Sequence, residues 1–208
     1  MDKKIISILI SIFFLGFVKS GYIHSQIFSD DDGKCTNMLI GSFALEGTCI
    51  DSLILSCSLD LSSVIAWKYE NSDCLGDPIG NQSYTTGGCV FSSSMFECTD
   101  QIYLPQNVNS IITVRHNSTE EECLDYKQGL VQLSYIKTSQ CTPNVIKPNK
   151  YSFIQTCDES SITQVNYQSI NCKPSTKTNS NSSPLPNNNC MNSTDYLSSY
   201  QFCYIPNF

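Results

Sequence analysis

The sequence predicts an all-β fold, a disulfide-stapled β-sandwich built from four strand–turn–cysteine repeat units. Three observations predict it: twelve cysteines fall into four groups of three, short apolar-rich pieces precede each third cysteine, and apolar residues alternate before the first cysteine of three groups. Alternation with a period of two turns one face of a strand inward. The recurrence of such units along one chain is typical of a repeat architecture.

The cysteine pattern predicts a disulfide framework. A large, even number of cysteines in an exported chain indicates disulfides, because the secretory route is oxidising. Three cysteines per unit leave one sulfur over, so we expect the pairing to cross between units. The predicted disulfide residues are Cys35, Cys49 and Cys57; Cys74, Cys89 and Cys98; Cys123, Cys141 and Cys157; and Cys172, Cys190 and Cys203.

Each element of a unit has its own signal. The residues five positions before the third cysteines are all serines: Ser52, Ser93, Ser152 and Ser198. The pieces that follow them are LILS, SMFE, FIQT and SYQF, whose composition suits strands. The alternating segments before the first cysteines lie at 65–69, 112–116 and 163–167.

The first twenty residues have the pattern of a signal peptide. A short basic start precedes an apolar run of fourteen residues at 5–18, and a bilayer span needs about 20 residues. We expect cleavage after Ser20, with an uncleaved anchor as the alternative. No other run is long enough for a transmembrane segment. The expected product is secreted, with delivery to endosomes or lysosomes as a further possibility.

The mature chain divides most naturally into two six-cysteine halves, 21–106 and 107–208. The widest interval between groups, from Cys98 to Cys123, lies in the middle of the chain. Cysteine spacings are short in the first two groups and longer in the last two. One continuous sandwich of all four units is the alternative, because repeats often bury a core only by stacking.

Charge limits the partners of the mature chain. Removal of residues 1–20 leaves 9 basic and 18 acidic side chains, a net of −9. An acidic surface repels phosphate, so we expect no nucleic-acid partner.

The stretch YENSDCLGDP at 69–78 raises the question of a reactive thiol or a metal site. Acidic neighbours such as Asp73 and Asp77 disfavour a thiolate at Cys74. The other units keep no carboxylate at a fixed offset from their cysteines. Asn, Asp, Ser and Gly stabilise turns, so the stretch predicts a turn, and we expect no metal or cofactor site.

Catalytic signals are weak. The two histidines, His24 and His116, lack the sequence context of a triad, and no recognisable hydrolase motif is present. The acidic runs 30–32 and 120–122 leave a glycosidase-type carboxylate pair open, although solvated turn charges are the simpler interpretation. Calcium at 30–33 lacks a downstream glutamate at the required spacing.

Loop and modification signals complete the pattern. The polar segment 173–189 has the composition of a flexible loop. Predicted glycosylation sites, expected on turns or loops, are Asn81, Asn117, Asn181 and Asn192. The single tryptophan, Trp67, lies on an alternating segment and is expected to pack in a core or at an edge.

The unit WKYENSDCLGDP, followed by YTTGGC and SSMFEC, resembles units in the counting-factor-associated proteins of social amoebae and the bacteriolytic proteins grouped with them. The resemblance implies one of two roles: lysis of ingested bacteria, or extracellular group-size signalling. The partner would be a bacterial envelope or an extracellular protein. The bare repeat module favours the bacteriolytic role, acting at acidic pH. No catalytic residue is carried over from the resemblance.

Overall fold

The computed structural model describes residues 21–29, 34–91, 93–116, 130–144, 150–158, 160–185, 191–192 and 198–206. The predicted signal peptide, 1–20, lies outside these residues. Within them the chain forms strands and turns, with one short 3-10 helix at Pro174–Thr176 and no α-helix. The prediction of an all-β fold is confirmed. No element in this part of the chain is a helix able to cross a lipid bilayer.

The described residues form a succession of strands. They are β1 (Tyr22–Phe28), β2 (Met38–Leu45), β3 (Cys49–Ile50), β4 (Leu53–Cys57), β5 (Ser63–Lys68), β6 (Gly80–Thr85), β7 (Ser94–Thr99), β8 (Ser110–His116), β9 (Leu130–Lys137), β10 (Cys141–Pro143), β11 (Ser152–Cys157), β12 (Ser161–Tyr167), β13 (Lys177–Pro184), β14 (Met191–Asn192) and β15 (Ser198–Tyr204). The apolar-rich pieces form β4, β7, β11 and β15, and the alternating segments fall largely in β5, β8 and β12.

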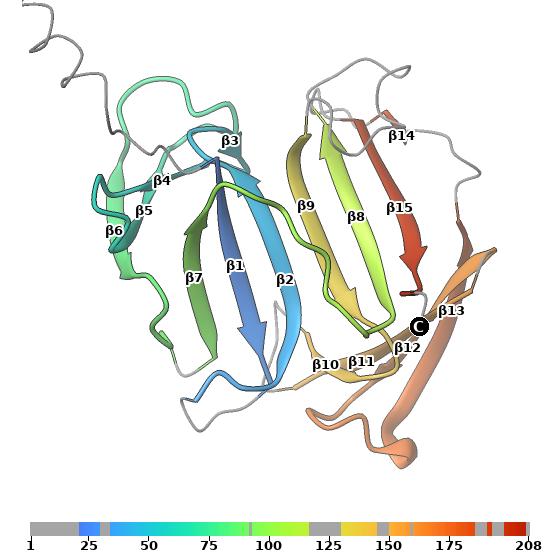
Figure 1. Ribbon diagram of the computed structural model, residues 1–208. Coiled ribbons are helices and arrows are strands. Elements are labelled where there is room, and N and C mark those ends of the chain that lie inside the picture. Colours follow the sequence, from blue (N-terminus) through green and yellow to red (C-terminus); the bar gives the residue numbers. More distant parts are fainter. Residues whose placement is uncertain are drawn as a thin grey trace, which may run out of the picture.

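Three antiparallel sheets make up the fold. The large sheet has the order β14-β15-β8-β9-β2-β1-β7, and the two small sheets have the orders β3-β4-β5-β6 and β10-β11-β12-β13. Figure 1 shows the large sheet face on, with the small sheets toward its two ends. Contacts of β5 with β7 and of β11 with β8 hold the small sheets to the large one.

The sheet order reveals a twofold repeat. In each half the first strand (β1 or β8) pairs with the second (β2 or β9) and with the last (β7 or β15), while the third to sixth strands form a small sheet. Pairing of β2 with β9 joins the two halves into one large sheet. The repeating structural element is therefore a half of the chain.

Within this twofold repeat the four strand–turn–cysteine units are not equivalent in their strand pairing. Each unit does end in a strand that carries its third cysteine. However, β4 and β11 belong to small sheets, whereas β7 and β15 belong to the large sheet. The local sequence pattern is the same in the small sheets and in the large sheet. It predicts a strand and a turn, but it does not predict which strand pairs with it.

The core lies on one face of the large sheet, where its two halves meet. Phe43, Ile112, Val114, Leu133 and Tyr135 are almost fully buried there. The connection from β7 to β8 crosses this face (Figure 1) and packs Ile102 and Leu104 against the cluster. Burying each large apolar side chain contributes roughly 1.5–3 kcal/mol, so this seam stabilises the joint between the halves.

Five disulfides join cysteines of different units. In the first half they are Cys35–Cys89, Cys49–Cys74 and Cys57–Cys98; in the second half they are Cys141–Cys172 and Cys157–Cys203. Each bridge connects units one and two or units three and four. Cys123 and Cys190 lie outside the described residues.

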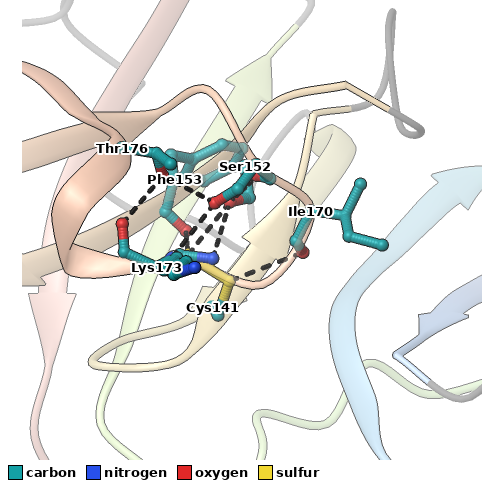
Figure 2. The surroundings of a disulfide bond; sticks show 8 residues. Cys141, Ser152, Phe153, Ile170, Lys173 and Thr176 are labelled. Atoms are coloured by element: carbon teal, nitrogen blue, oxygen red, sulfur yellow. Dashed lines mark hydrogen bonds between the residues drawn. A yellow bond between two sulfur atoms is a disulfide. The ribbon is translucent and has the colours of Figure 1, made fainter.

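One of the predicted serines supports a disulfide directly. Figure 2 shows Ser152 beside the Cys141–Cys172 bridge. Its buried hydroxyl donates to the carbonyl of Ser169 at 2.5 Å and accepts from the backbone N–H of Cys172 at 3.1 Å. A single side chain at the start of β11 therefore holds the turn that carries the next unit's first cysteine.

The stretch around Cys74 is a turn. The N–H of Cys74 donates to the carbonyl of Asn71 at 3.2 Å, and the N–H of Leu75 donates to Oδ1 of Asp73 at 3.3 Å. Cys74 has a φ of 55°, and the first cysteines of groups one and four, Cys35 and Cys172, both have a φ of 50°. These units thus share a cysteine whose backbone adopts the left-handed conformation at the end of a polar turn.

Two expectations about loops were wrong. The segment 173–189, predicted as a flexible loop, contains the strand β13, which pairs along its length with β12. The sequons at Asn81 and Asn181 lie within the strands β6 and β13 and not on turns. Both strands are at the free edges of their sheets, where polar side chains remain exposed to solvent. Asn192 lies in β14, and Asn117 is outside the described residues.

Candidate functional site

His24 is the centre of a polar cluster on the core face of the large sheet. The register of β1 places His24 between Phe43 of β2 and Glu97 of β7. Its ring stacks on that of Phe43, with centroids 4.1 Å apart and planes 2° from parallel. Only 1% of the histidine is exposed, so it lies beneath the surface.

The hydrogen bonds around His24 favour one tautomer of its ring. The hydroxyl of Tyr135 donates to Sδ of Met38 at 3.1 Å, so its oxygen accepts from Nε2–H of His24, also at 3.1 Å. Nδ1 is then an acceptor, facing the amide nitrogen of Gln26 at 3.0 Å and the hydroxyl of Tyr103 at 2.7 Å. This arrangement suits a neutral imidazole.

Glu97 shares the same donors. Its Oε2 accepts from the amide of Gln26 at 3.3 Å and lies 3.1 Å from the hydroxyl of Tyr103. Oε2 is 3.4 Å from Nδ1 of His24. Because Gln26 has two amide protons, one can serve the ring and the other the carboxylate. Glu97 is thus held beside His24 by a shared donor.

A glycine makes the cluster possible. Gly41 of β2 pairs with Tyr135 of β9, and a Cβ at that position would overlap the tyrosine ring. The missing side chain lets the ring of Tyr135 cross β2 and reach His24 on β1. The cluster therefore joins residues from both halves of the chain.

A cavity of about 390 Å³ opens next to this cluster. Glu97 and Tyr103 line it from the large sheet and the β7–β8 connection, and Leu61, Thr86 and Gly87 line it from turns of the first small sheet. Tyr103 is 47% exposed and the side chain of Glu97 is 39% exposed. The accessible part of the site is therefore one carboxylate beside one phenol.

The surroundings of the cluster shift the pKa of three of its side chains. Burial lowers the pKa of His24, although the hydrogen bond and charge of Glu97 oppose that shift. Burial, with the charge and hydrogen bond of Glu97, raises the pKa of Tyr103 to about 12. Burial also raises the pKa of Tyr135. The phenols thus stay protonated at neutral pH, and burial favours the neutral form of the histidine.

The other residues considered from the sequence lie elsewhere. His116 ends β8, is fully buried, and stacks on Tyr200 with centroids 6.0 Å apart. The acidic runs 30–32 and 120–122, with the calcium hypothesis at 30–33, fall outside the described residues. No group of three or more metal-ligating side chains occurs among the residues that are described.

Sequence reasoning missed the His24 cluster. Glu97, Tyr103 and Tyr135 are 73, 79 and 111 positions from His24 along the chain. No local motif can reveal contacts made through strand register at that separation. The single usable signal was the location of His24 in a short strand-like segment after the predicted cleavage site.

Comparison with known proteins identifies the family of the chain. No curated protein and no solved structure matches the chain. The family model described as "Counting factor-associated protein A/B/C" matches residues 3–200, nearly the whole length. The chain therefore belongs to the counting factor-associated protein A/B/C family.

Proposed function

We propose that the protein is a secreted signalling component of counting-factor type, which acts by binding an extracellular protein partner. Family membership supports an extracellular, signalling-type role. The disulfides and the family name both agree with a secreted protein. The observation that carries the proposal is the accessible carboxylate of Glu97 beside the hydroxyl of Tyr103 in the lining of the cavity.

The state of His24 favours action near neutral pH. Protonation would add a proton at Nδ1, which the amide nitrogen of Gln26 already faces at 3.0 Å. Burial disfavours that proton as well, since it lowers the pKa of His24. A network made for the neutral ring suits an extracellular medium better than an acidified compartment.

The cavity supports binding of a polar or cationic group. Glu97 offers one carboxylate, and Tyr103 offers a protonated hydroxyl beside an exposed ring. Such a pair suits an ammonium or guanidinium group from a partner protein, by charge pairing and by contact with the aromatic face. Among the described residues that line this cavity, Glu97 alone has a carboxylate.

The bacteriolytic role is the second candidate. Its support is the charge of the mature chain, which becomes positive in acid as the carboxylates protonate and would then favour contact with an anionic envelope. The family description does not name such an activity. Delivery to lysosomes is proposed only for the bacteriolytic role.

Two assays with the purified mature protein separate the candidates. The first adds the protein to developing social amoebae at neutral pH and measures group size. The second measures turbidity loss of a bacterial suspension from pH 4 to pH 7. The site variant is Glu97→Gln. The matched control is Gln101→Glu, the reverse substitution at an exposed position outside the cavity.

We expect the wild-type protein and the control to change group size in a dose-dependent way, and Glu97→Gln to do so less. We expect no turbidity loss at any pH. Turbidity loss that peaks in acid, with no effect on group size, would replace the signalling role by the bacteriolytic one.

A further inference from the structure

One face of the β3–β6 sheet places the chain's single tryptophan beside a glycosylation sequon. Trp67 of β5 pairs with Asn81 of β6 on one side and with Ile54 of β4 on the other. Residues directly opposite in antiparallel strands point to the same face, with Cβ atoms about 4.5–5.5 Å apart. Trp67 and Asn81 are therefore immediate neighbours on that face.

The tryptophan ring is fixed but incompletely covered. Nε1 of Trp67 donates to the hydroxyl of Ser56 at 3.0 Å, which ties the indole across β4. Trp67, Ile54 and Ile65 are each only partly buried. Ile65 stands two positions before Trp67, so it shares the same face. Together they form a small apolar surface without full cover from the described chain.

Asn81 is placed to carry a group that covers this surface. Both Asn81 and Ser83, which complete the N-x-S sequon, are exposed. β6 is the last strand of its sheet, so within the described part of the chain no further strand lies beyond Asn81. A group attached to Asn81 can reach inward over β5, where Trp67 lies.

We propose that Asn81 carries an N-linked glycan whose first N-acetylglucosamine packs against Trp67. In the secretory pathway, Nδ2 of Asn81 attacks C1 of an oligosaccharide carried on a lipid diphosphate. The Nδ2–C1 bond forms, the bond from C1 to the diphosphate oxygen breaks, and the amide loses one proton. The C–H face of the sugar then meets the electron-rich face of the indole.

The second half of the chain provides an internal contrast. Val165 corresponds to Trp67, because each stands at the same distance before the first cysteine of its group. Val165 pairs with Ser180. The nearby sequon residue, Asn181, pairs instead with Gln164. Adjacent strand residues point to opposite faces, so a glycan on Asn181 does not meet an equivalent aromatic surface.

The glycan would also protect an edge. Free edge strands are prone to pair with other chains, and β6 is such a strand. A bulky, solvated group on its face hinders that pairing. Packing on Trp67 therefore both covers apolar surface and keeps the glycan over the edge.

The test uses the full chain secreted from a eukaryotic host, with three single substitutions. Ser83→Ala removes the Asn81 sequon and keeps the asparagine; Ser83→Thr keeps the sequon; Ser183→Ala removes the sequon at Asn181. Glycopeptide mass spectrometry measures occupancy. Because the chain has one tryptophan, acrylamide quenching of its fluorescence reports on Trp67 alone.

We expect Asn81 to be occupied in the wild type and in Ser83→Thr. We expect Ser83→Ala alone to increase quenching and to lower the Tm, by about 2–4 °C for each kcal/mol of lost packing. An unoccupied Asn81 would overturn the proposal. Equal quenching and equal Tm in wild type and Ser83→Ala would overturn the packing on Trp67, even if Asn81 is occupied.

Discussion

Ser42 and Ser134 are cross-strand partners at the junction of β2 and β9, and each holds the same place in its own half of the chain. Ser42 stands seven positions before Cys49, and Ser134 stands seven positions before Cys141. An approximate twofold axis therefore passes between them. The large sheet is formed by two copies of one arrangement, joined where equivalent residues meet.

The twofold arrangement predicts a sixth disulfide, Cys123–Cys190. In the first half, the first cysteine of one group pairs with the second of the next, as in Cys35–Cys89. The other two bridges of the second half follow the first half's pairing. The same rule pairs Cys123 with Cys190, and this prediction comes from the repeat alone.

Peptide mapping of the unreduced, alkylated protein measures this pairing. We expect one cross-linked peptide that contains Cys123 and Cys190 and no alkylated cysteine. Detection of either residue as a free thiol, or linked to a different cysteine, would show that the repeat does not extend to this bridge.

Replacement of Ser152 by alanine is expected to destabilise the second half. The change leaves the carbonyl of Ser169 and the N–H of Cys172 without the hydroxyl that now serves both. Loss of a buried partner costs about 1–3 kcal/mol. Urea unfolding with the disulfides intact measures this cost. Ser183→Ala on exposed β13 is the control, and an equal effect of the two changes would refute the role of Ser152.

Gly41→Ala tests the crossing of Tyr135 over β2. The added methyl group overlaps the tyrosine ring, so we expect a loss of about 1–3 kcal/mol in the free energy of unfolding. The same change in a Tyr135→Leu background should cost less, since the ring is gone. A double-mutant cycle with no coupling between the two positions would contradict this account.

The strands and turns were largely readable from the sequence. Alternation around Trp67 and Ile112 places residues of one strand on opposite faces, and this signal is local. The turn at Cys74 followed from its Asn and Asp neighbours. By contrast, the polar strand β13 was not predicted, because Ser and Asn disfavour strands and its pairing with β12 overrides that preference.

Sequence alone could not reveal how the halves join or where His24 lies. Pairing of β2 with β9 depends on long-range register, which local patterns do not encode. The contact of His24 with Tyr135 depends further on Gly41, a residue that looks like any other glycine in a strand. The candidate site therefore became visible only once the strands were placed side by side.

The stability of the fold should fall on mild acidification. The pKa of His24 is lowered in the folded state, so the unfolded chain binds the proton first as pH falls through its ordinary value of 6.5. The stability loss thus begins near pH 7 and continues until the folded pKa is reached. One proton limits the slope to about 1.4 kcal/mol per pH unit.

Urea unfolding between pH 5 and pH 8 measures this slope, and His24→Gln is expected to flatten it. The control is Asp60→Asn. Hydrogen bonds from Ser58 and Ser62 lower the pKa of Asp60 to about 2, so it acts below pH 4 and should not alter the slope. A slope unchanged by His24→Gln would show that this residue does not titrate in that range.

Binding of labelled protein to intact developing social amoebae, measured at pH 7 and at pH 5, tests the central claim most directly. The account predicts saturable binding at pH 7 that weakens at pH 5 and is reduced by Glu97→Gln, whose carboxylate lines the cavity beside Tyr103. Saturable binding that strengthens at pH 5, or that is absent at both values, would contradict a signalling role in the extracellular medium.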